Sequence, residues 1–231
     1  MTTIFKSDGA GGMGLDLNRN GTSDFTADSN GNKSIGDGTN KLVISSSGVV
    51  TMEGTAKRTL ITRPTFDVTQ QISHAKPSQV ELGVASVYSL PVYNSDNEEL
   101  FFREIVPGRW DGASNITFCV IAALSGAEDV GDKFNLQFSW EHQKIGEPFK
   151  VTSNDVPIET IILTDHAAQY DTYCVEFPID YDIDTASDLI LARQPLFGRL
   201  RRIAATSLEV TNEILITNWY VKYTVDKILA A

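Results

Sequence analysis

Apolar and polar residues alternate with a period of two through much of the chain beyond residue 55. The clearest run is Phe-Asn-Leu-Gln-Phe-Ser-Trp-Glu at residues 134–141, which places apolar residues on one side and polar residues on the other. This pattern predicts an antiparallel strand with one buried face. Similar runs predict further strands at residues 80–88, 100–106, 116–122, 158–164, 173–179, 199–204 and 215–223.

Helical patterning is weak throughout the sequence. We find no convincing amphipathic run of about 12 residues, and no internal repeat with a period of about 20–50 residues. About eight strands with irregular loops over roughly 170 residues predict an all-β fold, an antiparallel β-sandwich of the jelly-roll type. A closed barrel is the alternative, because strand patterns do not fix how the strands connect.

Residues 1–54 have a different composition. They hold ten of the 17 glycines, none of the eight prolines and only two of the 21 aromatic residues, Phe5 and Phe25. So few large side chains cannot offset the entropy that the segment loses on ordering alone. We therefore expect residues 1–58 to be a glycine-rich, extended segment that is disordered or is ordered by other chains. Residues 59–231 are expected to form the β-sandwich domain.

Short-range signals in the N-terminal part predict turns and one hairpin. Asn20-Gly21 and Asn30-Gly31 are tight-turn dipeptides. Residues 41–45 and 49–52 are short apolar strands separated by Ser46-Ser47-Gly48. A hairpin of two strands is marginal in water by itself, so this feature also indicates partner chains.

The charge balance is acidic, with 19 Lys and Arg against 30 Asp and Glu and a net charge of −11. We expect no binding to nucleic acid, because phosphate backbones are bound by basic surfaces. No apolar run approaches about 18 residues, so no membrane span is expected, and the first residues lack the layout of a secretory signal. Arg199, Arg201 and Arg202 form the one basic cluster, which either binds an acidic partner or belongs to a surface strand.

Known catalytic signatures are missing from the sequence. There is no G-x-S-x-G, no phosphate-binding loop and no C-x-x-C, and the three histidines are far apart. The string at residues 9–14 matches a dinucleotide motif but lacks the flanking strand and helix that binding requires. We therefore expect a protein that is not an enzyme. Cys119 and Cys174 could form a disulfide if their strands are neighbours, but we expect two free thiols.

One polar segment is similar to a calcium-binding loop. Asp16, Asn18 and Asn20 place oxygen-bearing side chains at alternate positions, a glycine follows, and Asp24 closes the segment. Calcium prefers such oxygen ligands. Ala27 stands where an EF-hand would carry Glu, so a polar turn is the alternative. Calcium is the only cofactor that the sequence suggests.

A loop at residues 107–114 carries Arg109, Trp110 and Asp111, which a simple turn does not need. An exposed Trp beside Arg and Asp is typical of sugar-stacking sites and of protein interfaces. The sequence therefore predicts a ligand or interface site at these three residues. The alternative is that Trp110 packs into the end of the sandwich.

Residues 36–56 resemble a segment that is common in virion proteins of tailed bacteriophages. The matching residues are Gly36-Asp37-Gly38-Thr39-Asn40, Val43-Ile44-Ser45, Gly48-Val49-Val50 and Gly54-Thr55-Ala56. The resemblance implies a non-enzymatic virion protein with a glycine-rich anchor that binds other virion proteins, an intertwined homotrimeric stem and an outward β-sandwich. A head fibre, a capsid decoration and a tail fibre all fit. The alternative is a tail-associated receptor- or carbohydrate-binding module in which Trp110 contacts a host surface glycan.

Overall fold

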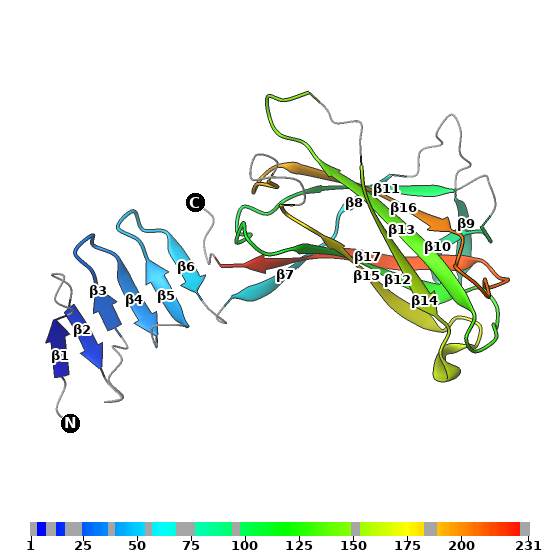
Figure 1. The fold of residues 1–231 in the computed structure, drawn as a ribbon, viewed down its shortest axis with the longest axis horizontal. Helices are drawn as coiled ribbons and strands as arrows, with labels where there is room; N and C mark the ends of the chain where they lie inside the picture. The colour runs from blue at the N-terminus through cyan, green and yellow to red at the C-terminus, as the bar shows by residue number, and fades with distance from the viewer. Residues whose placement is uncertain are drawn as a thin grey trace. The chain divides into compact units, whose positions relative to one another are not determined.

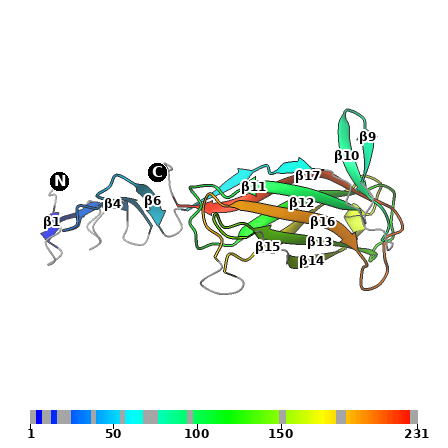
Figure 2. The same cartoon turned by 90° about the horizontal axis from the view of Figure 1, so that it is seen from above.

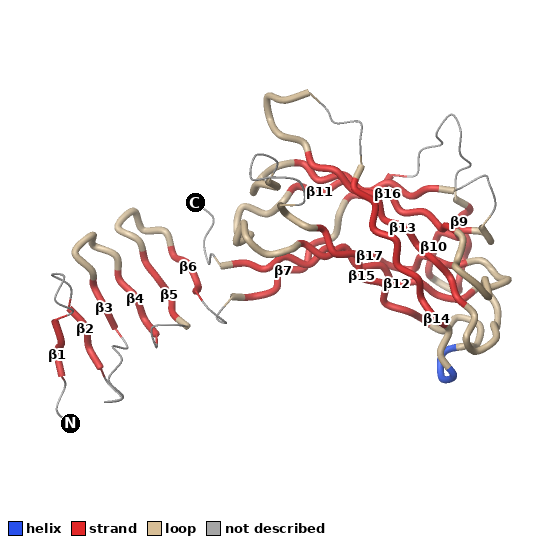
Figure 3. Tube along the Cα trace, in the orientation of Figure 1, coloured by secondary structure: helices blue, strands red, loops and turns tan. Residues whose placement is uncertain are grey.

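The computed structural model describes residues 4–7, 13–16, 25–36, 40–53, 57–67, 77–93, 98–148, 153–182 and 189–226. Over these residues the protein is all-β with antiparallel sheets, as predicted. The described part contains no α-helix, and a turn of 3-10 helix at Thr164–His166 is the blue segment in Figure 3. No helix within those ranges is long and apolar enough to cross a membrane.

The chain divides into two compact units. The first consists of Met1–Leu60, Pro107–Ser114 and Tyr223–Ala231, and the second consists of Ile61–Val106 and Asn115–Lys222. The first unit therefore combines the glycine-rich segment with two short stretches from much later in the sequence.

The first unit contains a six-stranded antiparallel sheet in which each strand pairs with its neighbours in sequence. The strands, drawn in blue to cyan in Figure 1, are β1 (Ile4–Ser7), β2 (Met13–Asp16), β3 (Phe25–Ala27), β4 (Lys33–Gly36), β5 (Lys41–Ile44) and β6 (Val50–Glu53). The predicted hairpin is confirmed as β5 and β6, with Gly48 at φ +85° in the turn, a conformation that favours glycine. The predicted Asn30-Gly31 turn joins β3 to β4, and the Asn20-Gly21 turn lies outside the described residues.

Two further sheets are built from the strands that follow. One has the order β15-β12-β17-β10-β9 with β7 paired to β17, and the other has the order β14-β13-β16-β11-β8. Their strands are β7 (Arg58–Thr62), β8 (Thr65–Asp67), β9 (Ser78–Leu82), β10 (Ala85–Leu90), β11 (Glu99–Ile105), β12 (Ile116–Leu124), β13 (Lys133–His142), β14 (Asn154–Ile161), β15 (Thr172–Ile179), β16 (Pro195–Ile203) and β17 (Ile214–Val225). From β10 onward the chain changes sheet at every step except between β13 and β14.

The predicted strands of this part appear, with the one at residues 158–164 displaced to Asn154–Ile161, except the one at residues 80–88, which is wrong. Those residues form a hairpin of β9 and β10, joined at Gly83 with φ +60°. Val84 beside it is fully exposed at the tip. Figure 2 shows this hairpin rising beside the other strands. The alternation of apolar residues continues on both sides of Gly83, so the pattern itself does not reveal the reversal of the chain.

Aromatic rings from these two sheets pack against one another. Phe118 of β12 stacks on Phe138 of β13 with ring centroids 4.1 Å apart, and Phe102 of β11 meets Phe118 edge-on at 4.7 Å. Phe134 of β13 contacts Tyr173 of β15 at 5.6 Å. Because burying each ring contributes roughly 1.5–3 kcal/mol, this aromatic cluster is a major part of what holds the sheets together.

The prediction that β13 has one exposed face is wrong. Its polar residues Asn135, Gln137 and Ser139 are buried, like the apolar residues between them. On the neighbouring strand β16, Arg201 donates from Nε and Nη2 to Gln137 Oε1 at 2.9 and 2.7 Å, and Arg199 Nη2 donates to Ser139 Oγ at 3.3 Å. The long arginine side chains cover this side of β13, because their aliphatic stems can lie along a strand surface.

Gly198 of β16 leaves room for the aromatic cluster, since a Cβ at this position would overlap the ring of Phe138. We expect Gly198→Ala to lower the free energy of unfolding by about 1–3 kcal/mol, because a packed core must shift to accept the extra carbon. Urea denaturation measures the change. The control is the same substitution in a Phe138→Leu background, where the cost should nearly vanish. An equal loss in both backgrounds would contradict the overlap.

Candidate functional site

The six-stranded sheet of the first unit has rows of apolar positions on one side. Paired residues lie on the same side of a sheet, whereas successive residues along a strand lie on opposite sides. One row of paired positions crosses all six strands and is apolar throughout: Phe5, Leu15, Phe25, Ile35, Leu42 and Met52. A second row on the same side is Ser7, Met13, Ala27, Lys33, Ile44 and Val50. We call these two rows the apolar face.

The apolar face is only partly covered where its side chains are described. Phe25 and Ile35 are 42% and 43% exposed, and Leu42 is half-buried. The opposite side of the sheet is more polar, with Thr26 Oγ1 in contact with Ser34 Oγ. Met52 of the same row is buried within the chain. A sheet with one polar side and one partly exposed apolar side is typical of a protein interface.

Sequence reasoning missed most of this sheet, because glycine and short polar residues weaken every strand signal. A signal does exist at longer range, since Phe5, Leu15, Phe25 and Ile35 are spaced ten residues apart. Between Phe25 and Ile35 the chain completes one strand and one turn, and the register returns the tenth residue to the same row of the sheet. This spacing is shorter than the repeats of about 20–50 residues that identify most repeat architectures.

The predicted calcium ligands are largely beyond what the structure describes. Asp16 ends strand β2, and Asn18, Asn20 and Asp24 lie outside the described residues. Among the residues that the structure does describe, no group of three or more His, Cys, Asp or Glu is placed to hold a metal ion. Calcium binding at Asp16, Asn18, Asn20 and Asp24 therefore stays a prediction.

The predicted ligand loop has a buried centre. Trp110 is fully buried, and its Nε1 donates a hydrogen bond to the Ser114 carbonyl at 3.1 Å. Its backbone forms an isolated β-bridge with Val225, within the same unit. The interpretation of Trp110 as an exposed stacking platform is therefore wrong, because the indole is buried within the protein. Arg109 is exposed, so the guanidinium group of this loop is accessible to solvent and the tryptophan ring is not.

Asp111 organises the same loop. Its carboxylate accepts hydrogen bonds from the backbone of Ala113 and Ser114 at 3.1 and 2.9 Å and from Ser114 Oγ at 2.6 Å. Lys57 Nζ lies 2.7 Å from Oδ2, and the Asp111 side chain is fully buried. Burial raises the pKa of Asp111, but the hydrogen bonds from Lys57, Ser114 and Ala113 outweigh it, and the net pKa is lowered. Asp111 is thus occupied by a structural task.

The predicted three-arginine cluster is split by the alternation of β16. Arg202 is buried, and its Nε and Nη2 donate to Glu209 Oε1 at 3.0 and 2.6 Å. The remaining donor contacts are to the backbone carbonyls of Pro91, Val210 and Asn212 at 2.9–3.2 Å. Arg202 therefore ties loops together in the interior and is not part of a surface cluster.

Arg199 and Arg201, on the other side of β16, form a polar patch with a buried carboxylate. Arg199 Nη1 lies 3.3 Å and Arg201 Nη1 4.0 Å from Glu99 Oε1, and the Glu99 side chain is 1% exposed. The two arginine side chains are 28% and 23% exposed. The two guanidinium groups are therefore partly accessible to solvent, and they lie over buried Gln137 and Ser139. We call these five residues the polar patch.

Cys119 and Cys174 lie on neighbouring strands, β12 and β15, yet both are free thiols. The register pairs Cys119 with Glu176 and Cys174 with Ile121, so the two cysteines are offset along the strands. Burial raises the pKa of the Cys119 thiol to about 11. The expectation of two free thiols is confirmed, and the alternative of a disulfide is wrong for this structure.

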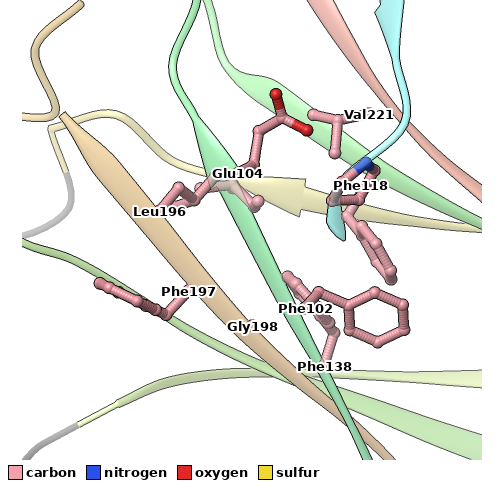
Figure 4. Close-up of a pocket in the computed structure, with 10 residues that line it drawn as sticks. Phe102, Glu104, Phe118, Phe138, Leu196, Phe197, Gly198 and Val221 are labelled. Atoms are coloured by element: carbon pink, nitrogen blue, oxygen red, sulfur yellow. The ribbon is translucent and has the colours of Figure 1, made fainter. Parts of the chain in front are cut away.

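A cavity of about 10 Å³ lies in the core of the second unit. Figure 4 shows the rings of Phe102, Phe118 and Phe138 beside it, with the carboxylate of Glu104 on another side. Burial raises the pKa of Glu104. The volume suits about one water molecule, whereas pockets for small-molecule ligands measure roughly 300–1,000 Å³. This cavity is a packing feature of the core.

Comparisons with known proteins give no further guide to the function of the site. No family model matches the chain, and no curated protein does either.

Asp111 gives the loop a stability that depends on pH. The pKa of Asp111 is lowered in the folded state. Its contribution to the free energy of unfolding is therefore fully present above the usual pKa of a carboxyl group, and it is lost as the pH falls through the folded-state pKa. We expect Asp111→Asn to lower the melting temperature at pH 7, and the difference from the native protein to shrink below about pH 4. Calorimetry at several pH values measures both. A difference that is constant over the whole pH range would show that the charge of Asp111 is unimportant.

Proposed function

We propose that this protein is a non-enzymatic structural component of a bacteriophage virion. In this proposal it is a homotrimeric fibre or capsid decoration, attached through its N-terminal segment with the β domain projecting outward. The observation that supports it most directly is the apolar face of β1–β6, where Phe25 and Ile35 are exposed in the single chain. A single-layer sheet in water needs a partner for such a face. Other copies of the chain and other virion proteins supply those partners.

The same proposal includes a jelly-roll sandwich for the β domain. Strands β10 to β17 supply two four-stranded arrays, β10-β17-β12-β15 and β11-β16-β13-β14. Neighbours within the arrays are mostly joined by long connections, which is the arrangement of a pair of Greek keys. The contact of Phe118 with Phe138 between the arrays supports packing of one on the other.

A jelly roll alone does not select the function, because the fold occurs in viral capsid proteins and in lectins. The second feature of the chain, its separate N-terminal sheet, favours the virion role. A separate sheet with an interface-like face is suited to attachment and assembly, and it has no evident use in a free sugar-binding domain. The net charge of −11 is compatible with an outward domain that must stay soluble.

Mass spectrometry of purified and salt-washed phage particles tests this proposal. We expect peptides of this chain in the particles, with a copy number that is a multiple of three if the homotrimer is correct. An enzyme from the same infected cells is the control for carry-over, and it should disappear on washing. A chain that washes away together with this control would overturn the virion role.

The polar patch favours one second candidate, a tail-associated receptor- or carbohydrate-binding module. Partly exposed Arg199 and Arg201 present guanidinium donors that suit sugar hydroxyl groups. If this alternative is correct, a glycan array should give binding that the Arg199→Ala and Arg201→Ala variants lose. The Arg109→Ala variant is the control, because Arg109 is exposed on a loop of the other unit. A blank array, or binding that only Arg109→Ala removes, would exclude the polar patch.

A further inference from the structure

We infer that the outer surface of strands β16 and β11 in the second unit binds a saccharide that carries a carboxylate group. The guanidinium groups of Arg199 and Arg201 hold the carboxylate, and the rings of Phe101 and Phe197 contact the sugar ring. The inference rests on the second candidate of the proposed function, the carbohydrate-binding module, and names its ligand class. It does not depend on where the chain is located in a virion.

The strand register places the arginines and the aromatic rings together on one side of the sheet. Phe197, Arg199 and Arg201 are alternate residues of β16, so they lie on the same side. On β11, Phe101 pairs with Arg199, and Arg103 pairs with Phe197. Paired residues are about 4.5–5.5 Å apart at their Cβ atoms, and alternate residues of one strand are about 7 Å apart. Each aromatic ring therefore has a guanidinium group beside it.

The two aromatic side chains on this surface are only partly covered. Phe101 and Phe197 are half-buried, and Arg103 is exposed. Figure 4 shows the ring of Phe197 directed away from the rings of Phe102 and Phe138 in the core. A partly exposed aromatic ring can pack against the apolar face of a sugar, while polar groups beside it fix the orientation of the ligand.

The guanidinium groups are held in place and still have donors for a ligand. Among the described residues, Arg199 donates one hydrogen bond, to Ser139 Oγ at 3.3 Å. Arg201 donates from Nε and Nη2 to a single acceptor, Gln137 Oε1. Each guanidinium carries five N–H donors in a planar fork, which matches the two oxygens of a carboxylate. Arg199 in particular can bind a carboxylate and keep its present contacts.

The charge of this surface selects an anion, although the chain as a whole is acidic. On this side of β16 and β11 the described charged residues are Arg103, Arg199 and Arg201 against one carboxylate, Glu99. The Glu99 side chain is 1% exposed, and its oxygens accept no hydrogen bond from a described residue. Glu99 therefore offsets part of the positive charge from below the arginines and leaves an excess that a bound carboxylate neutralises.

The position of the patch favours a sugar over an acidic peptide. Strands β16 and β11 are interior strands of the sheet β14-β13-β16-β11-β8, so they have no free edge on which a peptide could add a strand. Glu141 of β13 and Asp155 of β14 stand on the same side of the sheet and confine the positive area to a few residues. A ring that carries its own carboxylate fits such a small area better than an extended acidic chain.

Binding of acidic saccharides to the purified native protein tests the inference. The probes are oligogalacturonate, oligoglucuronate and sialyllactose, each beside its methyl ester, together with a glutamate trimer. We expect at least one acid to bind, and its ester to bind about tenfold more weakly or less, because the ester lacks the charge that strengthens hydrogen bonds to guanidinium. Binding of none of the acids, equal binding of an acid and its ester, or equal binding of the glutamate trimer would overturn the inference.

Variants then locate the site on the protein. Arg199→Gln should weaken binding of the acid about tenfold, and Phe101→Leu should weaken it about threefold, because the aromatic contact is lost. Arg109→Gln is the matched control and should bind like the native protein, since Arg109 is an exposed arginine of the other unit. Native affinity in both Arg199→Gln and Phe101→Leu would overturn the assignment. The comparison of acid with ester uses native protein alone, so it stands even where a variant does not fold.

The outcomes also separate this inference from the proposed functions. Binding of neutral glycans alone would retain the carbohydrate-binding candidate and overturn the carboxylate ligand. All of these measurements use purified protein, so their failure is distinguishable from absence of the chain in phage particles.

Discussion

The contact between Phe118 and Phe138 is the interaction on which the larger unit depends. The two rings belong to different sheets, and they stack at 4.1 Å. Phe102 and Phe177 join them from β11 and β15, so the cluster connects strands that are far apart in sequence. Gly198 permits the arrangement, because any side chain there would occupy the space of the Phe138 ring. The packing of this unit thus depends on a large ring on β13, Phe138, and on a residue without a side chain on β16, Gly198.

Buried charged residues in the same unit satisfy polar groups that apolar side chains cannot satisfy. Arg202 neutralises Glu209 and satisfies three backbone carbonyls of loops that would otherwise be buried without partners. Breaking a buried ion pair of this kind costs about 3–5 kcal/mol in general. Arg201, the preceding residue, lies on the opposite side of the strand and covers Gln137. Arg201 and Arg202 therefore have different structural roles, because successive residues of a strand lie on opposite sides of the sheet.

Much of the β domain was predictable from the sequence, whereas its burial and the first sheet were not. Period-two patterning located strands such as β11, β13 and β15, because a buried side requires apolar residues at alternate positions. It did not reveal that Gln137 and Ser139 are covered, since the covering arginines are about 60 residues away. It also could not show that Trp110 is buried, because a tryptophan in a polar loop has the same local sequence whether it faces water or the core. The sheet β1–β6 was missed because its strands are short and glycine-rich, and their regularity appears only between strands.

The ten-residue spacing from Phe5 to Ile35 is compatible with a sheet of adjustable length. One strand and one turn form a unit that advances the sheet by about 4.8 Å and returns the next apolar residue to the same row. Because neighbouring strands are antiparallel, adding or removing one unit reverses the direction in which the chain leaves the sheet. Two units together, or about 20 residues, preserve that direction and change the length by about 10 Å. Insertion of whole strand pairs would therefore lengthen this sheet in discrete steps without reversing the direction of the chain.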